Sequence, residues 1–186
     1  MLDHRGTVTI HTDRLILRKF SINDAEDMLN NWANDNEVAK YLSWSPHGKI
    51  EVTREVISGW VRAYEMPTTY NWAIELKTTR KVIGSISVIE LSDKNHRCEI
   101  GYCMSKAYWN KGIMTESLRA VNGFLFSEVG INRIQAKHDT KNIASGKVME
   151  KTGMKHEGIF KQYKIRKDGT FGDLNMYAIV KEDIIE

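Results

Sequence analysis

The stretch "SKAYWNKGIMTES", residues 105–117, places a lysine and a glycine directly before a helical pattern. No carboxylate stands among Trp109, Asn110 and Lys111 to occupy the start of that helix. The first N–H groups of a helix lack intrahelical partners and carry about half a positive charge. A strand before, a helix after and Gly112 between them favour a phosphate or pyrophosphate bound on these amides.

Two common phosphate loops are excluded by spacing. Neither the Walker sequence Gly-x-x-x-x-Gly-Lys-Ser/Thr nor the dinucleotide fingerprint Gly-x-Gly-x-x-Gly occurs here. An ordinary helix start, with its amides bonded to water or a side chain, is the alternative to an anion site. The single glycine therefore predicts a looser anion cradle.

Other polar residues could serve in group transfer. Glu99 shares one strand face with Gly101 and Cys103, where a carboxylate acts either as a general base or in an ion pair. Asn142 and Ser145 open a predicted helix, where they could simply be capping residues. No Ser-His-Asp arrangement and no His/Cys/Asp cluster with metal-ligand spacing is evident, so no metal site is predicted.

Composition narrows the class of protein. The chain has 186 residues, 41% hydrophobic and 27% charged, with a net charge of +3 and no dense Lys/Arg run, so no nucleic-acid partner is expected. No apolar stretch approaches the roughly 20 residues that cross a bilayer, and no signal peptide is apparent. Cys98 and Cys103 are an odd number of residues apart and should face opposite ways, which favours reduced thiols and a cytoplasmic protein.

The elements that position these residues follow from periodicity and turn signals, and no linker divides the chain, so residues 1–186 are expected to form one domain. Residues 50–64 should form a helix with Val52, Val56 and Val61 on its apolar face. The expected single strands are 14–20, 96–104 and 131–139, and hairpins are expected over 70–91 (turn 77–81) and around 167–173. Two other helices are expected over 21–34 and 142–153. A further helix should begin at Gly112, with Leu118, Val121 and Leu125 on one face. This order predicts a mixed sheet with helices on both faces.

Four segments together resemble the GNAT superfamily of N-acetyltransferases, in particular its RimJ/RimL branch, which acetylates ribosomal-protein N-termini. They are "TDRLILRKFSINDAEDM", "EIGYCMSKAYWNKGIMTES", "INRIQAKHDTKNIASGKVMEKTGM" and "DGTFGDLNMYAIVKEDI". The family's motif A is Gln/Arg-x-x-Gly-x-Gly/Ala; Gly112 matches its central glycine, whereas Trp109 and Met114 depart from it. The resemblance implies an α/β (α+β) fold whose mostly antiparallel sheet contains a splayed parallel strand pair.

The resemblance also implies a site for acetyl-CoA. Its pyrophosphate would lie on the loop and its pantetheine arm between the splayed strands. Glu99 would be the base, and Ser145 would support thiolate release, because Met149 stands where many members carry a tyrosine acid. The implied cofactor contacts are Tyr102, Cys103, Met104, Trp109, Asn110, Lys111, Gly112, Ile113, Met114, Thr115, Asn142 and Ser145.

The expected reaction is direct attack by a primary amine in a ternary complex, without an acyl-enzyme. At pH 7 roughly a tenth of an α-amine is neutral, against less than about a thousandth of a lysine amine, which favours a peptide N-terminus. The alternatives are a small amine (polyamine, aminoglycoside or metabolite) and a non-catalytic CoA-binding sensor. A homodimer is also expected from the branch resembled.

Overall fold

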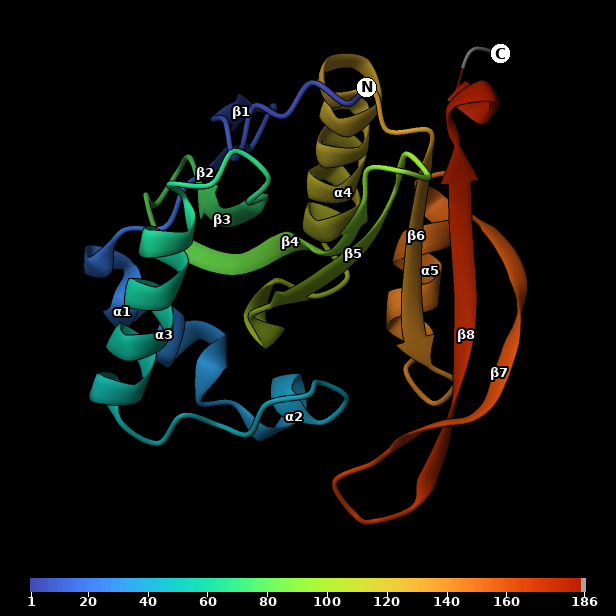
Figure 1. Ribbon diagram of the computed structural model, residues 1–186. Coiled ribbons are helices and arrows are strands. Elements are labelled where there is room, and N and C mark those ends of the chain that lie inside the picture. Colours follow the sequence, from blue (N-terminus) through green and yellow to red (C-terminus); the bar gives the residue numbers. More distant parts are fainter. Residues whose placement is uncertain (185–186) are drawn as a thin grey trace.

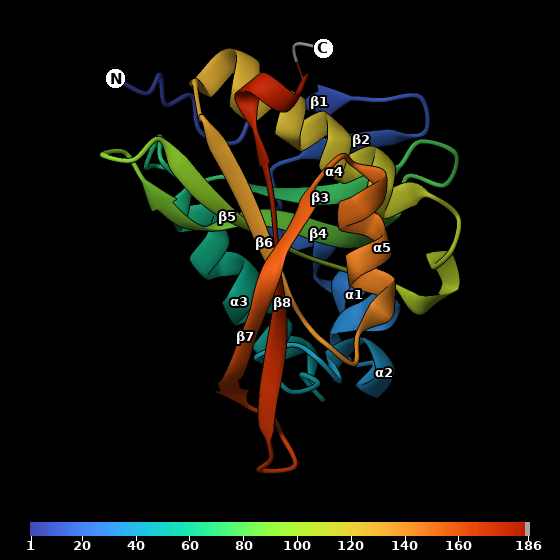
Figure 2. The same cartoon turned by 90° about the vertical axis from the view of Figure 1, so that its right-hand side faces the viewer.

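Over residues 1–184, which the computed structural model describes, the chain forms one sheet of eight strands (Figures 1 and 2). The strands lie side by side in the order β1-β2-β3-β4-β5-β6-β8-β7. In this part of the chain every neighbouring pair is antiparallel except β5 and β6. Their bounds are β1 Ile10–His11, β2 Leu15–Arg18, β3 Asn71–Leu76, β4 Val82–Ser92, β5 Arg97–Met104, β6 Arg133–Asp139, β7 Lys155–Ile165 and β8 Phe171–Val180.

Alternate strand residues pack into two separate cores. Trp72 of β3 belongs to the core formed with α4 (Ile113–Phe124) and α5 (Ile143–Lys151). Ala73 belongs to the core formed with α1 (Ala25–Met28) and α3 (Ile50–Ala63). Because successive strand residues point to opposite faces, these helix pairs cover opposite faces of the sheet. We call the face under α4 and α5 the back face and the other the front face. The expected α/β architecture is confirmed.

The predicted helix over 21–34 is interrupted. A 3₁₀ turn, Ile22–Asp24, precedes α1, and a π-type turn, Leu29–Ala33, follows it. A π turn holds more residues than an α turn, and here it buries the neighbouring side chains of Trp32 and Ala33 together. A further short helix, α2 (Asn36–Ala39), has too few residues to show periodicity and was not predicted. None of the helices in residues 1–184 has the length and apolarity needed to cross a membrane.

The predicted helix over 50–64 is present as α3, but its predicted apolar face is wrong. Val52 and Val61 are 41% and 39% exposed, while Thr53 and Ile57 are fully buried. Residues four apart share a helix face, and the Thr53 hydroxyl is hydrogen-bonded to an imidazole of the preceding loop, so a polar residue can lie at the buried centre. Val56 lies at the edge of this contact, partly buried.

The parallel strands β5 and β6 separate after three paired positions. Glu99 and Gln135 form the last pair, after which β5 follows β4 and β6 follows β8 (Figure 1). A bulge in β4 between Val88 and Glu90 lies at the same level, and bulges bend the strands that carry them. The splayed parallel pair expected for this fold is therefore confirmed. We call the gap between β5 beyond Glu99 and β6 beyond Gln135 the wedge.

Candidate active site

The loop between β5 and α4 leads into a helix whose first N–H groups have no backbone partner in the described residues. Gly112 precedes the helix with a φ of +73°, a left-handed conformation that glycine adopts without steric cost. Asn110 also has a positive φ, 59°. Within residues 1–184, the first amide of this helix that has a backbone acceptor is that of Glu116, which donates to Gly112 O at 3.0 Å. The amides of residues 113–115 therefore lack backbone partners, as is usual for the first turn of an α-helix.

Most side chains of this loop turn away from those amides. Ile113 and Met114 are buried in the back-face core, and Thr115 is half-buried. The Lys111 ammonium lies 5.3 Å from the centre of the Tyr108 ring, a cation–π contact. A ligand at the start of α4 can therefore reach Ile113 and Met114 only through their main chain.

The carboxylate in the first turn of α4 is hydrogen-bonded to the turn between β1 and β2. Glu116 Oε1 accepts from Thr12 Oγ1 at 2.6 Å, and its Oε2 accepts from Arg14 Nε at 2.6 Å. Burial raises the pKa of Glu116, but these hydrogen bonds outweigh it and leave the pKa below its usual range. Arg14 also donates to the carbonyl oxygen of Lys111 at 2.9 Å. Arg14 therefore offsets the negative charge of Glu116 in the first turn of α4, a role that the sequence alone did not indicate.

The backbone of Tyr102, Cys103 and Met104 borders the wedge, with side chains alternating between the two faces. The Tyr102 hydroxyl donates to the carbonyl oxygen of Ser145 at 2.9 Å, across the back of the wedge. Burial raises the pKa of Tyr102, and a hydrogen bond with the Ser145 side chain offsets only part of that rise. The indole of Trp109 donates to the carbonyl oxygen of Met104 at 2.9 Å, which fixes the loop against the end of β5.

Glu99 is buried on the front face at the point where the strands part, with 4% of its surface exposed. Its Oε2 accepts from Gln135 Nε2 at 3.1 Å and lies 2.9 Å from Lys137 Nζ. Burial lowers the pKa of Lys137, but hydrogen bonding and attraction to Glu99 outweigh it and raise that pKa overall. An ion pair was one of the two roles expected for Glu99, and the structure contains this ion pair. Its partners come from β6 and were not predicted.

The first turn of α5 faces the wedge from the back. Asn142 Nδ2 donates to Ser145 Oγ at 3.0 Å, and the Asn142 side chain caps no backbone amide. The simple capping role considered for Asn142 is therefore wrong. Its ψ of 65° lies outside the extended conformation that N-cap residues usually adopt. Ser145 Oγ accepts the hydrogen bond from Asn142, and a hydroxyl that accepts can also donate its proton to an anion.

His138 is a packing residue beneath α5. Its Nδ1 donates to the carbonyl oxygen of Asp139 at 2.9 Å, while its buried Nε2 has no partner within residues 1–184. A Cβ added to Gly146 would lie 2.7 Å from that Nε2, so the ring rests against the helix backbone. Burial lowers the pKa of His138.

The two cysteines are poor candidates for nucleophiles. Cys98 packs in the back-face core and Cys103 against the front-face core, so they face opposite ways as expected. Burial raises the pKa of Cys98 to about 12 and that of Cys103 to about 11. A thiol reacts as its thiolate, which both environments disfavour. In the described residues no group of three or more His, Cys, Asp and Glu side chains could hold a metal ion.

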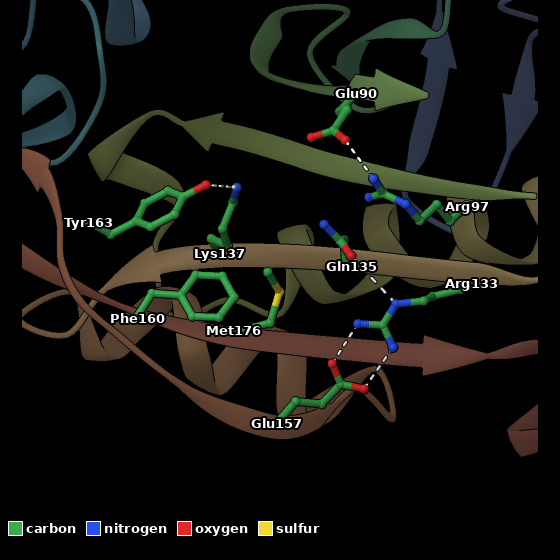
Figure 3. Close-up of a pocket in the computed structure, with 9 residues that line it drawn as sticks. All are labelled: Glu90, Arg97, Arg133, Gln135, Lys137, Glu157, Phe160, Tyr163 and Met176. Carbon is green, nitrogen blue, oxygen red and sulfur yellow. Dashed lines mark hydrogen bonds and ion pairs between the residues drawn. The ribbon is translucent and has the colours of Figure 1, made fainter. Parts of the chain in front are cut away.

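The front face is hollowed directly above Glu99. Gln135 and Lys137, the partners of Glu99, line an open trough of about 440 Å³ that reaches from β4 to β7 (Figure 3). The trough is lined by Glu90, Arg97, Arg133, Gln135, Lys137, Glu157, Phe160, Tyr163 and Met176. Its volume lies within the range of small-molecule sites.

The wedge separates the two groups that acyl transfer would need. Glu99 lies on its front side, while the Ser145 hydroxyl and the wall made by Tyr102 lie behind it. This arrangement suits acyl transfer through the wedge. A base on the front side can activate the nucleophile, and a hydrogen-bond donor on the back side can stabilise the leaving group.

Comparison with known proteins also points to acyl transfer. A sequence profile of the acetyltransferase (GNAT) domain matches residues 14–155. The Bacillus subtilis N-acetyltransferase YoaA is 36% identical over 172 residues, which cover 92% of this chain and 96% of YoaA. The Escherichia coli ribosomal protein uS5-alanine N-acetyltransferase is 24% identical over 184 residues, or 95% of this chain and 92% of that enzyme. A crystal structure of a GNAT-family acetyltransferase from Bacillus anthracis superposes with a TM-score of 0.82 and 29% identity, covering 94% of this chain and 99% of that one.

The matched segment 14–155 contains Arg14, the wedge, the loop and all of α5. The two relatives match this chain over nearly their full length, and both are named as N-acetyltransferases. The chain therefore belongs to the GNAT acetyltransferase family, as an N-acetyltransferase whose acetyl donor is acetyl-CoA.

Proposed function

We propose that acetyl-CoA binds with its pyrophosphate on the backbone amides of residues 110–115 and its pantetheine arm in the wedge. Left-handed Gly112 and the amides that follow it support the first contact. The unpaired edge of β5 along residues 102–104 supports the second, because pantetheine amides can pair with it as an added strand. Trp109 and Asn142 border the two ends of this path.

Glu99 then takes a proton from the incoming amine, directly or through one water. The observation that carries this proposal is the position of Glu99, buried and doubly hydrogen-bonded on the front face where the wedge opens. An acceptor ammonium shares the carboxylate with Lys137 before it loses its proton. The neutral amine attacks the thioester carbonyl carbon and forms the new C–N bond, and the CoA sulfur departs as thiolate. The attacking nitrogen gives its second proton to water.

Ser145 stabilises that thiolate by donating its hydroxyl proton in a hydrogen bond. Asn142 donates to the Ser145 oxygen from the other side, so the serine can turn its proton toward the sulfur. A free thiol has a pKa of about 8.5, so a thiolate is a fair leaving group and a hydrogen bond is sufficient help. The position of Met149, buried in the back-face core, keeps it away from this role.

The acceptor we favour is the α-amine of a peptide or protein N-terminus, as in the RimJ/RimL branch. The likeness to an enzyme named for the alanine of ribosomal protein uS5 supports this choice. A polyamine or aminoglycoside is disfavoured, because three cations but two carboxylates line the trough above Glu99.

We also propose that two copies pair through the edge strand β7. This strand exposes Ile159, Tyr163 and Ile165, at 47%, 55% and 69% of their surface, next to an unpaired backbone edge. Exposed apolar side chains beside an unpaired strand edge favour pairing with a second strand. A mass corresponding to two chains in light scattering, lost in Ile165→Lys, would support the dimer, and a wild-type monomer would contradict it.

Release of free CoA thiol tests the proposed chemistry. The enzyme and acetyl-CoA are combined with N-terminal peptides, polyamines or aminoglycosides, using wild type, Glu99→Gln and Ser145→Ala. We expect Glu99→Gln to lower kcat about 100-fold or more and Ser145→Ala to lower it about tenfold, with little change in acetyl-CoA affinity. Matched controls are Glu128→Gln and Ser127→Ala, two exposed positions outside the strands of the wedge and outside the trough.

The outcomes separate the alternatives. A wild-type rate in Glu99→Gln would remove that residue as the base. Tight acetyl-CoA binding without thiol release on any amine would favour the non-catalytic sensor. Turnover of polyamines or aminoglycosides in preference to peptides would replace the proposed acceptor but keep the reaction.

A further inference from the structure

The trough carries a pair of arginines that the proposed reaction does not use. Arg97 of β5 and Arg133 of β6 are directly opposite each other in the parallel register. Both side chains lie on the front face, two residues before Glu99 and Gln135 (Figure 3). Like charges at opposed positions of neighbouring strands repel, so this placement has a cost that its surroundings must offset.

Two carboxylates that line the trough, Glu90 and Glu157, offset the repulsion between the arginines to different extents. Arg133 makes a two-pronged contact with Glu157, with distances of 2.7 and 2.5 Å. Arg97 makes a single contact of 3.0 Å with Glu90, and the two side chains are 33% and 50% exposed. Single exposed ion pairs are weak and exchange readily with other partners. The Arg97 guanidinium is therefore the cation in the trough that a ligand can most easily engage.

The distance from this arginine pair to Glu99 sets the shape of such a ligand. Two residues of a strand span about 7 Å. An acceptor whose amine lies at Glu99 would thus bring a group about 7 Å further along to Arg97 and Arg133. In a peptide, the side-chain carboxylate of the second residue lies about 5–7 Å from the N-terminal nitrogen.

We propose that the trough selects peptide N-termini with an acidic second residue, whose carboxylate binds Arg97 and Arg133 while the α-amine lies at Glu99. This inference rests on the proposed function and adds specificity-determining residues to it. The carboxylate replaces Glu90 at Arg97, where the guanidinium can hold it with two parallel hydrogen bonds. The apolar wall formed by Phe160 and Met176 on the opposite side of the trough receives the rest of the peptide chain (Figure 3).

A series of peptides that differ only at the second residue tests this selectivity. The kcat/KM is measured for peptides with Asp, Asn or Lys at that position, with acetyl-CoA saturating. For wild type we expect the Asp peptide to exceed the Asn peptide about fivefold or more, and the Lys peptide to be the slowest. In Arg97→Gln the Asp-to-Asn ratio should fall below about two, because kcat/KM for the Asp peptide falls more than kcat/KM for the Asn peptide.

Two further variants test whether the Asp-to-Asn ratio depends specifically on Arg97. Glu90→Gln frees Arg97 of its competitor and should raise the Asp-to-Asn ratio above that of wild type. Arg5→Gln serves as the matched control, because Arg5 is also an exposed, ion-paired arginine but lies outside the trough. It should leave the ratio unchanged.

Different experimental results would overturn the proposed function and the proposed selectivity. No acetylation of any peptide overturns both of them. Acetylation with equal rates on the Asp and Asn peptides, or a ratio that Arg97→Gln does not change, overturns only the selectivity. Preferred turnover of 4-aminobutanoate, which carries an amine and a carboxylate without a peptide, overturns the peptide as the source of the acid.

Discussion

The Tyr102 hydroxyl donates to the carbonyl oxygen of Ser145 at 2.9 Å and so joins β5 to α5 behind the wedge. The two strands that border the wedge are paired only up to Glu99 and Gln135. The spacing between β5 and α5 beyond that point therefore depends on side chains, and Tyr102 supplies a direct bond across it.

Removing this bond should loosen the wedge. For Tyr102→Phe we expect the free energy of unfolding to fall by about 1 kcal/mol and the Kd for CoA to rise several-fold, because one wall of the wedge is less firmly held. Chemical denaturation and calorimetry measure the two quantities. Tyr41→Phe, on the loop after α2, is the control. Unchanged CoA affinity in Tyr102→Phe would show that the bond does not shape the wedge.

Gly146 should resist a substitution that helices normally favour. Alanine is preferred to glycine within helices by about 1 kcal/mol. At Gly146, however, the new Cβ would lie 2.7 Å from His138 Nε2, so we expect Gly146→Ala to destabilise the fold by about 1–3 kcal/mol. Gly123 of α4 is exposed and has no atom within 4 Å of the corresponding position. Gly123→Ala should therefore leave stability unchanged or raise it.

Denaturant unfolding of the two variants measures this difference. A combination of Gly146→Ala with His138→Ala should be less destabilising than the sum of the single changes, since the second change removes the clash. Strict additivity would contradict the contact between the helix backbone and the imidazole.

The stability of the fold should decline as the pH falls below neutrality. Burial lowers the pKa of His138 in the folded state, so the unfolded chain takes up a proton first, near its ordinary pKa of about 6.5. The stabilising contribution is complete above that pH and is lost as the pH falls toward the folded pKa. Urea unfolding at pH 7.5 and 5.5 measures the slope.

The variant His138→Asn should flatten this pH dependence, whatever it does to stability at pH 7.5. His47, whose pKa burial also lowers, accounts for a slope that remains. An identical slope in wild type and His138→Asn would rule out His138 as a source of the acid sensitivity.

Neither cysteine should be required for turnover. Burial raises the pKa values of Cys98 and Cys103 to about 12 and about 11, so few thiolates exist at neutral pH. We expect Cys98→Ala and Cys103→Ala to retain kcat within a few-fold, and initial rates to follow a sequential pattern. Ping-pong kinetics, or loss of turnover in Cys103→Ala alone, would point to an acyl-enzyme instead.

Local patterns in the sequence determined the main elements and the loop that precedes α4. The spacing of Leu118, Val121 and Leu125 predicted the buried face of α4 and of the π-type turn that continues it, and all three are fully buried. Gly112 lies at the predicted start of that helix, with the positive φ that its residue type favours. These signals lie within a few residues of one another, so short-range geometry is enough to read them.

Short-range signals were misleading where the packing partner decides. The valines of α3 have helical spacing, yet Thr53 and Ile57 are the residues buried at its centre. Asn142 is a common capping residue, yet its amide is bonded to Ser145. In both cases another element, or a neighbouring side chain, outweighs the local preference.

Only the tertiary structure decided which side chains surround the candidate base. Glu99 is 36 residues from Gln135 along the chain, and Glu116 is 102 residues from Arg14. These contacts arise from the parallel register of β5 with β6 and from the packing of α4 beside β2. A sequence gives the types of these residues, but the register that joins them is a property of the whole sheet, because each strand is positioned by all of its neighbours.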